Sequence, residues 1–390
     1  MSRLEELIQM HCPNGVQFST VGAMCNISRG RVMSKDYLRE NAGEYPVYSS
    51  QTENDGEFGK ISTYDYDGEF LTWTTDGANA GSVFYRNGKF SITNVCGLIS
   101  VKNEQLSTRF LYFVLSKLAK SYVNSGMGNP KLMSNVMAKI KIPIPPLPVQ
   151  REIVRILDNF TELTAELTAE LTARKQQYGY YRDLLLNVDG KEYTLENVAL
   201  IVDCPHTSPK WKESGIPVIR NYNLVNGQID TSRLSYVDEE EYRSRIKRIV
   251  PMEDDILFSR EAPIGNVGII PKDFICCQGQ RVVLLRPNTD IVIPKFLLYI
   301  LQGGFVREQI YRVENIGSTV SNFNISDLRK LHFVIPPIEI QKHIIEKLDG
   351  FSCLCANISD GLPAEILARH KQYEYYRNIL LKFPERRVEA

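Results

Sequence analysis

The sequence predicts an α/β protein, in which two similar β-rich modules are separated by two long antiparallel helices that form a coiled coil. Three observations predict this fold class. Two blocks of sequence occur twice, about half the chain apart. Short β-type runs with Gly, Asn and Asp turns precede each copy. A stripe of apolar and aromatic side chains follows each copy, and its spacing is typical of a coiled-coil seam.

The repeated blocks identify a tandem duplication. The first block runs from Ile144 to Phe160 and again from Ile335 to Phe351; both copies share Ile-Pro-Pro, a glutamine and Leu-Asp-x-Phe. The second block reads Gln-Tyr-x-Tyr-Tyr-Arg and ends at Arg182 and at Arg377. Its copies lie slightly further apart, so the two halves differ in length within one segment. Duplication at this scale predicts two similar modules with pseudo-two-fold symmetry.

The chain divides into four segments. Residues 1–143 and 188–335 are the predicted β-rich modules, each with a twisted, mostly antiparallel sheet and a few short helices. Residues 144–187 and 336–390 are the predicted helical segments, and each opens with prolines. Within the first module, Asn87-Gly88 predicts a hairpin turn.

The two modules also resemble each other weakly. Residues 75–83 align with 259–267, sharing Ala, Gly and Val in one register. Residues 109–115 align with 295–301, and each is a predicted short helix. Diverged loops on a shared scaffold indicate that each module binds a different ligand.

The helical segments carry apolar positions that alternate by three and four residues. The first stripe contains Leu157, Phe160, Thr164, Leu167, Leu171, Arg174, Tyr178, Tyr181 and Leu185. The second contains Leu348, Phe351, Cys355, Ile358, Leu362, Ile366, Arg369, Tyr373, Tyr376 and Leu380. Two such stripes on one chain favour intramolecular antiparallel pairing. The alternative is that each stripe packs on its own β-rich module.

A tetrapeptide repeat lies within the first helical segment. Thr-Ala-Glu-Leu occurs at Thr164 and again at Thr168, after a truncated copy. The second segment has Gly361 and Pro363 in the equivalent stretch, which predicts a helix break with Pro363 in the first turn of a new helix. One tetrapeptide adds about 6 Å and about 40° to a helix. The alternative is a tolerant spacer that arose by replication slippage.

Composition is that of an ordinary globular protein. The chain has 390 residues, of which 43% are hydrophobic and 24% charged, enough for more than one core. No apolar run reaches the roughly 18–20 residues of a membrane span, and the acidic start predicts no signal peptide, so a cytoplasmic location is expected. The 8 cysteines show no Cys-x-x-Cys spacing, which argues against zinc sites and disulfides. A net charge of zero disfavours nucleic acid only weakly, because a local patch can still be basic.

Taken together, these motifs resemble those of specificity (S) subunits of type I restriction–modification systems. The Thr-Ala-Glu-Leu repeat is similar to the spacer of the type IC class. The resemblance covers nearly the whole chain. It implies two target recognition domains, each of which reads one half of a bipartite site on double-stranded DNA. It also implies that the two helices set the gap between the half-sites. A duplex turns roughly 36° per base pair, so one tetrapeptide corresponds to a step of about one base pair.

The resemblance further implies partner subunits. Two modification (methyltransferase) subunits are expected to dock on the helices, and restriction/translocase subunits to join later. S-adenosylmethionine, Mg and ATP are expected on those partners, and no cofactor is expected in this chain. The docking candidates are Leu157, Phe160, Leu167, Leu171, Tyr178, Tyr181, Leu348, Phe351, Ile358, Tyr373 and Tyr376.

The catalytic motifs of such systems are absent from the sequence. There is no Asn-Pro-Pro-Tyr/Phe methylase motif, no Gly-x-Gly-x-x-Gly loop and no Gly-x-x-x-x-Gly-Lys-Ser/Thr phosphate loop. The 5 histidines show no base–nucleophile spacing, and His206 near Cys204 is interpreted as a turn residue. We therefore predict a recognition subunit with no catalytic and no metal-binding residues.

Side-chain chemistry in the predicted loops indicates which residues contact DNA. Phosphates require Lys or Arg, and base edges require forked donors and acceptors. In the first module, the phosphate candidates are Arg29, Arg31 and Lys35, and the base candidates are Tyr48, Ser49, Gln51, Thr74, Asp76, Asn79, Asn129 and Lys131. In the second module, the candidates are Arg220, Asn221, Asn223, Ser259, Arg260, Glu261, Gln278, Gln280, Arg281, Thr319 and Asn322, with Arg243, Arg245 and Lys247 as a phosphate-contacting edge. The alternative for each is a solvated or turn-forming side chain.

Two other functions are compatible with the sequence. The same DNA reader could serve a methyltransferase-only complex or a different phage-defence assembly. A different class is a coiled-coil scaffold whose β-rich modules bind proteins. Zero net charge favours the scaffold, whereas duplicated modules on an adjustable spacer favour the DNA reader.

Overall fold

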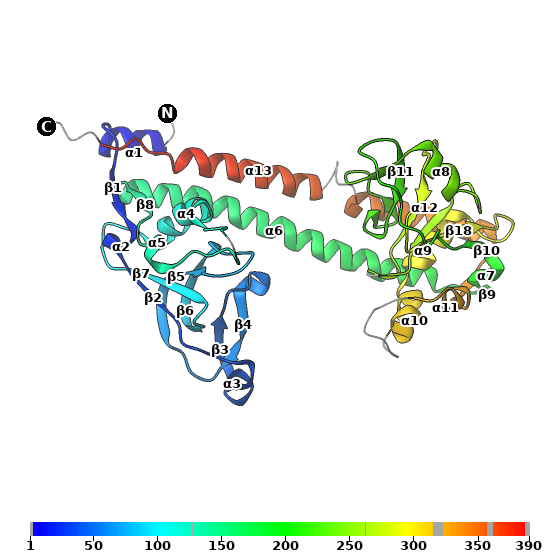
Figure 1. The fold of residues 1–390 in the computed structure, drawn as a ribbon, viewed down its shortest axis with the longest axis horizontal. Helices are drawn as coiled ribbons and strands as arrows, with labels where there is room; N and C mark the ends of the chain where they lie inside the picture. Colours follow the sequence, from blue (N-terminus) through cyan, green and yellow to red (C-terminus); the bar gives the residue numbers. More distant parts are fainter. Residues whose placement is uncertain (1–2, 127, 262, 315–322, 357–361, 387–390) are drawn as a thin grey trace. The chain divides into compact units, whose positions relative to one another are not determined.

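A computed structural model describes residues 3–126, 128–261, 263–314, 323–356 and 362–386 (Figure 1). The chain forms two compact units. The first contains residues 1–166 and 367–390, and the second contains residues 167–366. Each unit therefore combines one β-rich module with pieces of both helical segments.

The first unit is built on a six-stranded sheet of order β2-β7-β5-β6-β3-β4, with a separate ribbon β1-β8. Its core is centred on Trp73, Phe110 and Phe113, which are fully buried. Its elements are α1 (Arg3–His11), β1 (Gln17–Thr20), α2 (Val21–Met24), β2 (Cys25–Arg29), α3 (Lys35–Glu40), β3 (Ala42–Tyr48), η1 (Glu53–Gly56), β4 (Glu57–Ile61), β5 (Tyr66–Thr74), β6 (Val83–Ile92), β7 (Cys96–Val101), α4 (Thr108–Leu118), η2 (Ala119–Tyr122), α5 (Ser134–Met137) and β8 (Lys141–Ile144). It also contains parts of two helices that it shares with the second unit, the first half of α6 (Leu147–Leu186) and residues 367–380 of α13 (Leu362–Leu380).

The second unit contains a four-stranded sheet of order β10-β18-β15-β16, a three-stranded sheet β14-β11-β17 and the ribbons β12-β13 and β19-β9. Phe258 and Phe296 lie fully buried in its core. Besides the second half of α6, its elements are β9 (Lys191–Thr194), α7 (Leu195–Val198), β10 (Ala199–Val202), β11 (Ile216–Ile219), η3 (Asn221–Asn223), β12 (Leu224–Val225), β13 (Gln228–Ile229), β14 (Ser235–Val237), α8 (Glu239–Arg245), β15 (Ile256–Ser259), β16 (Val267–Ile269), β17 (Cys277–Gln278), β18 (Val282–Pro287), α9 (Pro294–Gln302), α10 (Gly304–Glu314), α11 (Ile325–Arg329), β19 (His332–Ile335) and α12 (Ile338–Ala356).

The two modules repeat one plan, which confirms the predicted duplication. The order β2-β7-β5-β6 in the first corresponds to β10-β18-β15-β16 in the second, and the ribbon β1-β8 corresponds to β9-β19. The predicted short helices are α4 and α9, which occupy equivalent positions in the two chain halves. Pairing is antiparallel except between β3 and β6 and between β11 and β17. The mostly antiparallel sheets therefore agree with the prediction.

The prediction of a hairpin turn at Asn87-Gly88 is wrong. Strand β6 continues through both residues, and Gly88 pairs with Gly68 of β5. Both glycines have positive φ values, 122° at Gly68 and 101° at Gly88, so two residues without a Cβ face each other within the ribbon. The β5–β6 connection is instead formed by residues 75–82.

A buried glutamine ties helix α6 to the first module. Gln150 is completely buried. Its Oε1 accepts a hydrogen bond from the backbone N–H of Ser107 at 2.9 Å, and its Nε2 donates to the carbonyls of Gln105 and Pro145, each at 2.7 Å. The Oγ of Ser107 also caps α4 by accepting from the N–H of Phe110. One side chain thus joins the proline entry of α6 to the start of α4.

The second unit repeats this arrangement with Gln341. This side chain is also completely buried. Its Oε1 accepts from the backbone N–H of Ile293 at 2.8 Å, and its Nε2 donates to the carbonyls of Ile291 at 3.0 Å and Pro336 at 2.9 Å. The duplicated glutamine therefore has the same three-bond role at the start of α12.

The helices of each unit meet through a stacked aromatic pair. In the first unit, α13 runs beside α6 in the opposite direction (Figure 1), and Phe160 stacks on Tyr376 with ring centroids 5.3 Å apart. In the second unit, Tyr181 of α6 stacks on Phe351 of α12 at 5.5 Å. The two pairs are reciprocal, because each joins the Phe of one repeated block to the Tyr of the other. They support the predicted coiled-coil pairing.

The stripe positions differ in burial between the middle of α6 and the ends of the stripe. Thr164, Leu167, Leu171 and Arg174 are half-buried, whereas their neighbours on α6 are mostly exposed. In contrast, Leu157 and Leu348 are completely buried in the two module cores, and Tyr178 and Tyr373 pack against those cores. At the ends of the stripes, the side chains therefore pack on the β-rich module of their own unit, as the alternative prediction stated. Ile358 lies outside the described residues. Helix α13 begins at Leu362 with Pro363 in its first turn, as predicted.

We predict that Gln150→Leu lowers the free energy of unfolding by at least about 2 kcal/mol, because it leaves a buried N–H and two buried carbonyls without partners. Gln341→Leu is expected to cost a similar amount. Urea denaturation followed by circular dichroism measures the change. Gln176→Leu, on the exposed face of α6, is the matched control. Equal midpoints for Gln150→Leu and Gln176→Leu would contradict the role assigned to the buried glutamine.

Candidate nucleic-acid interface

Polar side chains collect at one end of the four strands that the modules share, which are β10-β18-β15-β16 in the second module and β2-β7-β5-β6 of the six-stranded sheet in the first. In the second module, β10 and β15 end at this edge and β16 and β18 begin there, because neighbouring strands are antiparallel. The first module has the ends of β2 and β5 and the starts of β6 and β7 in the equivalent place. We call this the loop edge of each module.

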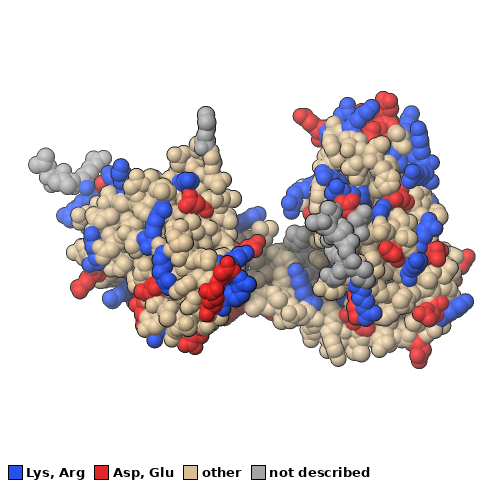
Figure 2. All heavy atoms as spheres, turned by 60° about the horizontal axis from the view of Figure 1, so that its bottom comes forward, with Lys and Arg blue, Asp and Glu red and all other residues tan. Residues whose placement is uncertain are grey.

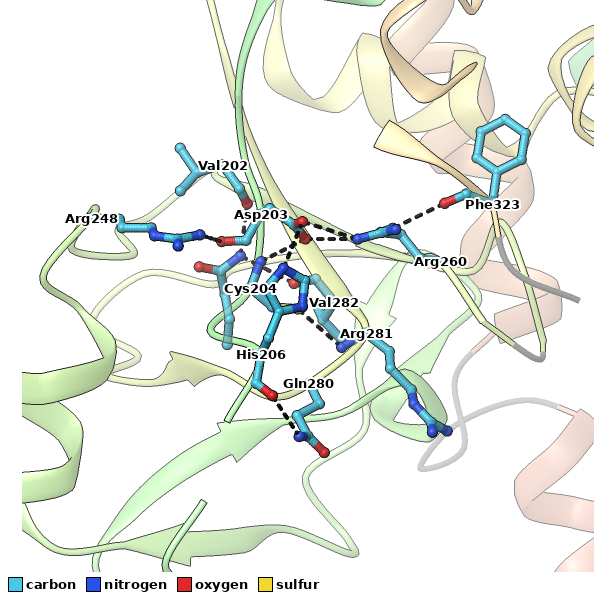
Figure 3. Close-up of polar contacts among 11 residues, drawn as sticks. Val202, Asp203, Cys204, His206, Arg248, Arg260, Gln280, Arg281, Val282 and Phe323 are labelled. Carbon is cyan, nitrogen blue, oxygen red and sulfur yellow. Dashed lines mark hydrogen bonds and ion pairs between the residues drawn. The ribbon is translucent and has the colours of Figure 1, made fainter. Parts of the chain in front are cut away.

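An ion pair organises the loop edge of the second module (Figure 3). Asp203 follows β10, and both of its carboxylate oxygens accept from Nη1 of Arg260 at 3.0 Å. The Nε of Arg260 donates to the carbonyl of Phe323 at 2.9 Å. Only 13% of the Arg260 side chain and 22% of the Asp203 side chain are exposed. Arg260 is therefore held in one orientation by three polar contacts.

A polar hollow of about 240 Å³ opens beside this pair, lined by Cys204, His206, Arg260, Glu261, Gln280 and Arg281. The guanidinium of Arg281 lies 2.7 Å from a carboxylate oxygen of Glu261. Gln280 donates to the carbonyl of His206 at 3.3 Å (Figure 3). Guanidinium, carboxylate and carboxamide are the groups that distinguish guanine, cytosine and adenine in the major groove. The hollow thus presents base-reading chemistry on loops.

Arg281 has an unusual backbone conformation. Its φ is 72°, in the left-handed region that residues with a Cβ rarely adopt. Its N–H donates to the Sγ of Cys204 at 3.2 Å, and its carbonyl accepts from the N–H of Arg260. Burial raises the pKa of the Cys204 thiol, so the sulfur stays protonated and neutral at pH 7. Local strain of this kind is concentrated at functional sites.

The loop edge of the first module has different side chains. Asp76, after β5, lies 3.7 Å from the Nζ of Lys131, and its backbone pairs with the same residue. Asn79 donates to the Oγ1 of Thr52 at 2.9 Å. Arg29, at the end of β2, donates to Ser134 at 3.4 Å. This edge therefore offers an Asp, an Asn, a Lys and an Arg where the second module has the Asp203–Arg260 pair.

Five candidate DNA contacts are buried, which argues against their touching DNA. Asn223 donates to the carbonyls of Asp230 and Arg233, and Ser259 donates to the carbonyl of Glu261. The other three are Thr74, Gln278, which bonds the carbonyls of Val202 and Val282, and Arg245, which bonds the carbonyls of Thr207 and Gln278 and the carboxylate of Glu241. The polar groups of Asn223, Ser259, Gln278 and Arg245 serve the interior of the modules, and the buried Oγ1 of Thr74 has no hydrogen-bond partner among the described residues. We therefore exclude all five from the proposed DNA contacts.

The remaining described candidates reach the surface. Exposed residues are Arg29, Arg31, Lys35, Gln51, Asn79, Asn129, Lys131, Arg243, Lys247 and Arg281; half-buried residues are Tyr48, Ser49, Asp76, Arg220, Asn221, Arg260, Glu261 and Gln280. Thr319 and Asn322 lie outside the described residues. Lys35 starts α3, and Arg31 pairs with Asp65 at 3.1 Å. Arg243 pairs with Glu239 on α8, so that edge is partly neutralised.

Sequence reasoning missed an aromatic cluster in the second module. The guanidinium of Arg220 lies 5.3 Å from the ring of Trp211 and 4.8 Å from that of Tyr222. Both rings are more than 40% exposed. The signal was present as Lys210-Trp211-Lys212, a tryptophan between two lysines in a loop. Asp203 was also missed, because a single acid after a strand carries no distinctive pattern.

Charges of both signs are mixed over the surface. On the face drawn in Figure 2, Lys and Arg side chains of each unit are interspersed with Asp and Glu. This agrees with the zero net charge of the chain. Any attraction to a polyanion must therefore come from local groups.

The described part of the chain contains no metal-binding cluster and no helix suited to cross a membrane. Within it, no group of three or more His, Cys, Asp or Glu side chains is placed to hold a metal ion. Among the same residues, no helix combines the length and the apolar character that a bilayer crossing requires.

Comparisons with known proteins agree on one family. The family description "Type I restriction modification DNA specificity domain" matches residues 13–174 and 187–368. A predicted type I specificity subunit of Mycoplasma pneumoniae is 35% identical over 370 residues, covering 93% of this chain and 96% of that protein.

Two solved structures share the fold. An S subunit of a type I restriction–modification system from M. genitalium aligns with a TM-score of 0.52 at 14% identity, covering 95% of this chain and 97% of that one. A chain from a structure on complex assembly and conformational transition of the type I R-M system aligns with a TM-score of 0.57 at 16% identity, covering 95% and 98%.

We predict that Arg281→Gly raises the free energy of unfolding by about 0.5–1 kcal/mol relative to Arg281→Ala. Alanine retains the Cβ that strains the left-handed backbone, whereas glycine relieves it. Thermal unfolding of the two variants under identical conditions measures the difference. An Arg281→Ala variant that is as stable as Arg281→Gly would show that the backbone is not strained at this position.

Proposed function

The chain belongs to the type I restriction–modification DNA specificity family, and we propose that each of its modules reads one half of a bipartite site on double-stranded DNA. In this role the chain is the non-catalytic specificity subunit. The observation that supports the proposal most strongly is the duplication of one sheet plan with different loop-edge side chains. Residues 1–143 and 188–335 are the target recognition domains in this proposal.

The loop edges supply the contacts in this proposal. In the second domain, Arg281, Glu261 and Gln280 read base edges from the hollow, and Arg260 supports them. In the first domain, Asp76 and Asn79 read bases, while Lys131 and Arg29 contact phosphates. Different chemistry at equivalent positions gives a different half-site for each domain. Bipartite DNA, with two unlike half-sites, is the ligand that fits such a pair. A protein-binding scaffold does not require two copies of one sheet plan with different side chains at equivalent positions.

The helices, residues 144–187 and 336–390, set the gap and bind the partner subunits in this proposal. The supporting observation is a duplicated pair of exposed apolar side chains. Tyr180 and Leu184 on α6 are 66% and 54% exposed, and Tyr375 and Ile379 at the equivalent positions of α13 are 62% and 50% exposed. Exposed apolar groups on a helix face mark a protein interface. One such pair per unit fits two copies of one partner, here two methyltransferase subunits.

These positions differ from the docking residues expected from the stripe. Leu157, Leu348, Tyr178 and Tyr373 pack inside their own unit, and Phe160, Tyr181, Phe351 and Tyr376 form the reciprocal stacks. The partner surface is therefore the neighbouring helix face. In the same proposal, restriction/translocase subunits join the complex, and S-adenosylmethionine, Mg and ATP bind to the partner subunits. The complex works in the cytoplasm. The Thr-Ala-Glu-Leu repeat is a spacer similar to that of the type IC class.

The proposal is tested by mixing the purified chain with its methyltransferase partner and a random pool of duplex DNA. We expect enrichment of a split motif with a degenerate gap. Arg281→Ala should relax one position of one half-site, at a cost of about 1–3 kcal/mol, and leave the other half-site unchanged. Arg243→Ala, which removes the same charge on α8, is the control for general loss of charge. Recovery of unsplit or random sequences at low salt would refute the proposal.

We further predict that deleting Thr168–Leu171 shortens the preferred gap by about one to two base pairs. Helix α6 loses about 6 Å and about 40° of rotation, whereas a duplex rises about 3.4 Å and turns about 36° per base pair. Binding to a series of duplexes with different gaps measures the preference. Replacing the same four residues with four alanines keeps the length and should keep the gap. A deletion variant that still folds and prefers the original gap would eliminate α6 as the ruler.

A further inference from the structure

A second cavity lies in the second unit, and it shares no lining residue with the polar hollow beside Arg260. Its volume is about 560 Å³, within the range of small-ligand sites. One wall is the last turns of α6, including Lys175 and Arg182, and another is α9 with Lys295 and Gln302. The β12–β13 turn and the start of α10 close the remaining sides. All of these residues belong to the second unit.

The cavity is rich in positive charge. Lys175, Arg182, Lys295 and Arg307 line it, and no aspartate or glutamate is among the described lining residues. Asp183 pairs with Arg182 at 3.1 Å, and Asp349 pairs with Lys295 at 2.7 Å. Within the described part of the chain, neither Lys175 nor Arg307 has an ion pair. The site thus holds an excess of about two positive charges.

Two of these cations are close enough to influence each other. Arg307 lies at the protein surface, yet partial burial of its guanidinium and the charge of Arg182 lower its pKa. The carboxylate of nearby Asp183 raises the pKa of Arg307 but offsets these two effects only in part. The Oδ1 of Asp183 also accepts a hydrogen bond from the N–H of Gly304, the first residue of α10, at 3.0 Å. Like charges held together in a partly dry site are costly unless an anion joins them.

The first unit is built differently at the equivalent place. Arg109 aligns with Lys295, and its guanidinium lies 4.7 Å from the ring of Tyr85, 5.0 Å from that of Tyr112 and 5.2 Å from that of Phe113. Aromatic rings thus surround the cation there. Arg109 also pairs with Asp158 at 2.6 Å, as Lys295 pairs with Asp349, so the two positions share an ion pair and differ in the rings around the cation.

We propose that this cavity binds a phosphate group, with Lys175, Arg182 and Arg307 as its cationic contacts. A phosphate monoester carries about −1.5 to −2 charges at pH 7, which matches the excess positive charge of the site. Carboxamides of Gln302, Gln228 and Asn226 and the apolar side chain of Leu298 offer contacts to the rest of a small ligand such as a nucleotide. A DNA backbone phosphate has related chemistry and is the second possible source. This proposal does not depend on the reading of bases at the loop edges.

The test is calorimetric titration of the full chain with inorganic pyrophosphate and with a nucleoside 5′-monophosphate at low ionic strength. We expect saturable binding, weakened at least about tenfold by Arg307→Gln and by Lys175→Gln, since hydrogen bonds to charged groups contribute about 1.5–3 kcal/mol. Lys120→Gln removes the same charge from an exposed position of the first unit and should change nothing. Circular dichroism verifies that each variant is folded.

Titration with a short duplex separates the two sources. A small-molecule site keeps its affinity for the nucleoside monophosphate when duplex is present. If the cavity binds a DNA backbone phosphate, the duplex displaces pyrophosphate from it. In that case Arg307→Gln lowers the salt dependence of DNA binding by about one ion. Absence of pyrophosphate binding together with an unchanged salt dependence in Arg307→Gln would overturn the proposal. A chain that binds pyrophosphate but no DNA would refute only the DNA-reading function. A chain that binds DNA but no pyrophosphate, with the same salt dependence in Arg307→Gln, would refute only this inference.

Discussion

The hydrogen bonds of two buried glutamines are the interaction on which the rest of the structure depends. Gln150 and Gln341 each connect the proline entry of a long helix to the loop before the main helix of a module. Fully buried amides that satisfy three backbone groups fix orientation as well as distance, because any rotation leaves polar groups unpaired. A loop edge can present side chains in a defined direction only if its module is held rigidly on its helix.

The sequence predicted those parts of the fold that the duplication or a regular period records. The repeated blocks revealed the two modules, and the three-and-four spacing revealed the helices that stack through Phe160 with Tyr376 and through Tyr181 with Phe351. The prediction from Asn87-Gly88 was wrong because the same dipeptide occurs in tight turns and within long strands. Only the pairing of Gly88 with Gly68 distinguishes the two cases.

The candidate site was less predictable, for a different physical reason. Gln278 and Gln280 are two residues apart with the same side chain, yet one is buried and bonds the carbonyls of Val202 and Val282, while the other lines the hollow. Burial of a loop polar group depends on strands far away in the sequence, and loops have no period that reports it. The strain at Arg281 is equally hidden, because a positive φ in an arginine follows from its neighbours in space. Chemistry can therefore nominate loop residues, but tertiary contacts select among them.

The composition of the first unit has a consequence for the order in which the protein is made. That unit needs residues from both ends of the chain: Leu381 is buried in its core, and Arg386 donates a backbone hydrogen bond to Val16. The second unit is continuous in sequence. During synthesis on the ribosome, the module translated first must wait for residues 367–386 to emerge, whereas the module translated second has all its parts earlier. Nascent chains therefore complete their two halves in the reverse of the order in which they are translated, and a truncated product would have an intact second half and an unfinished first half.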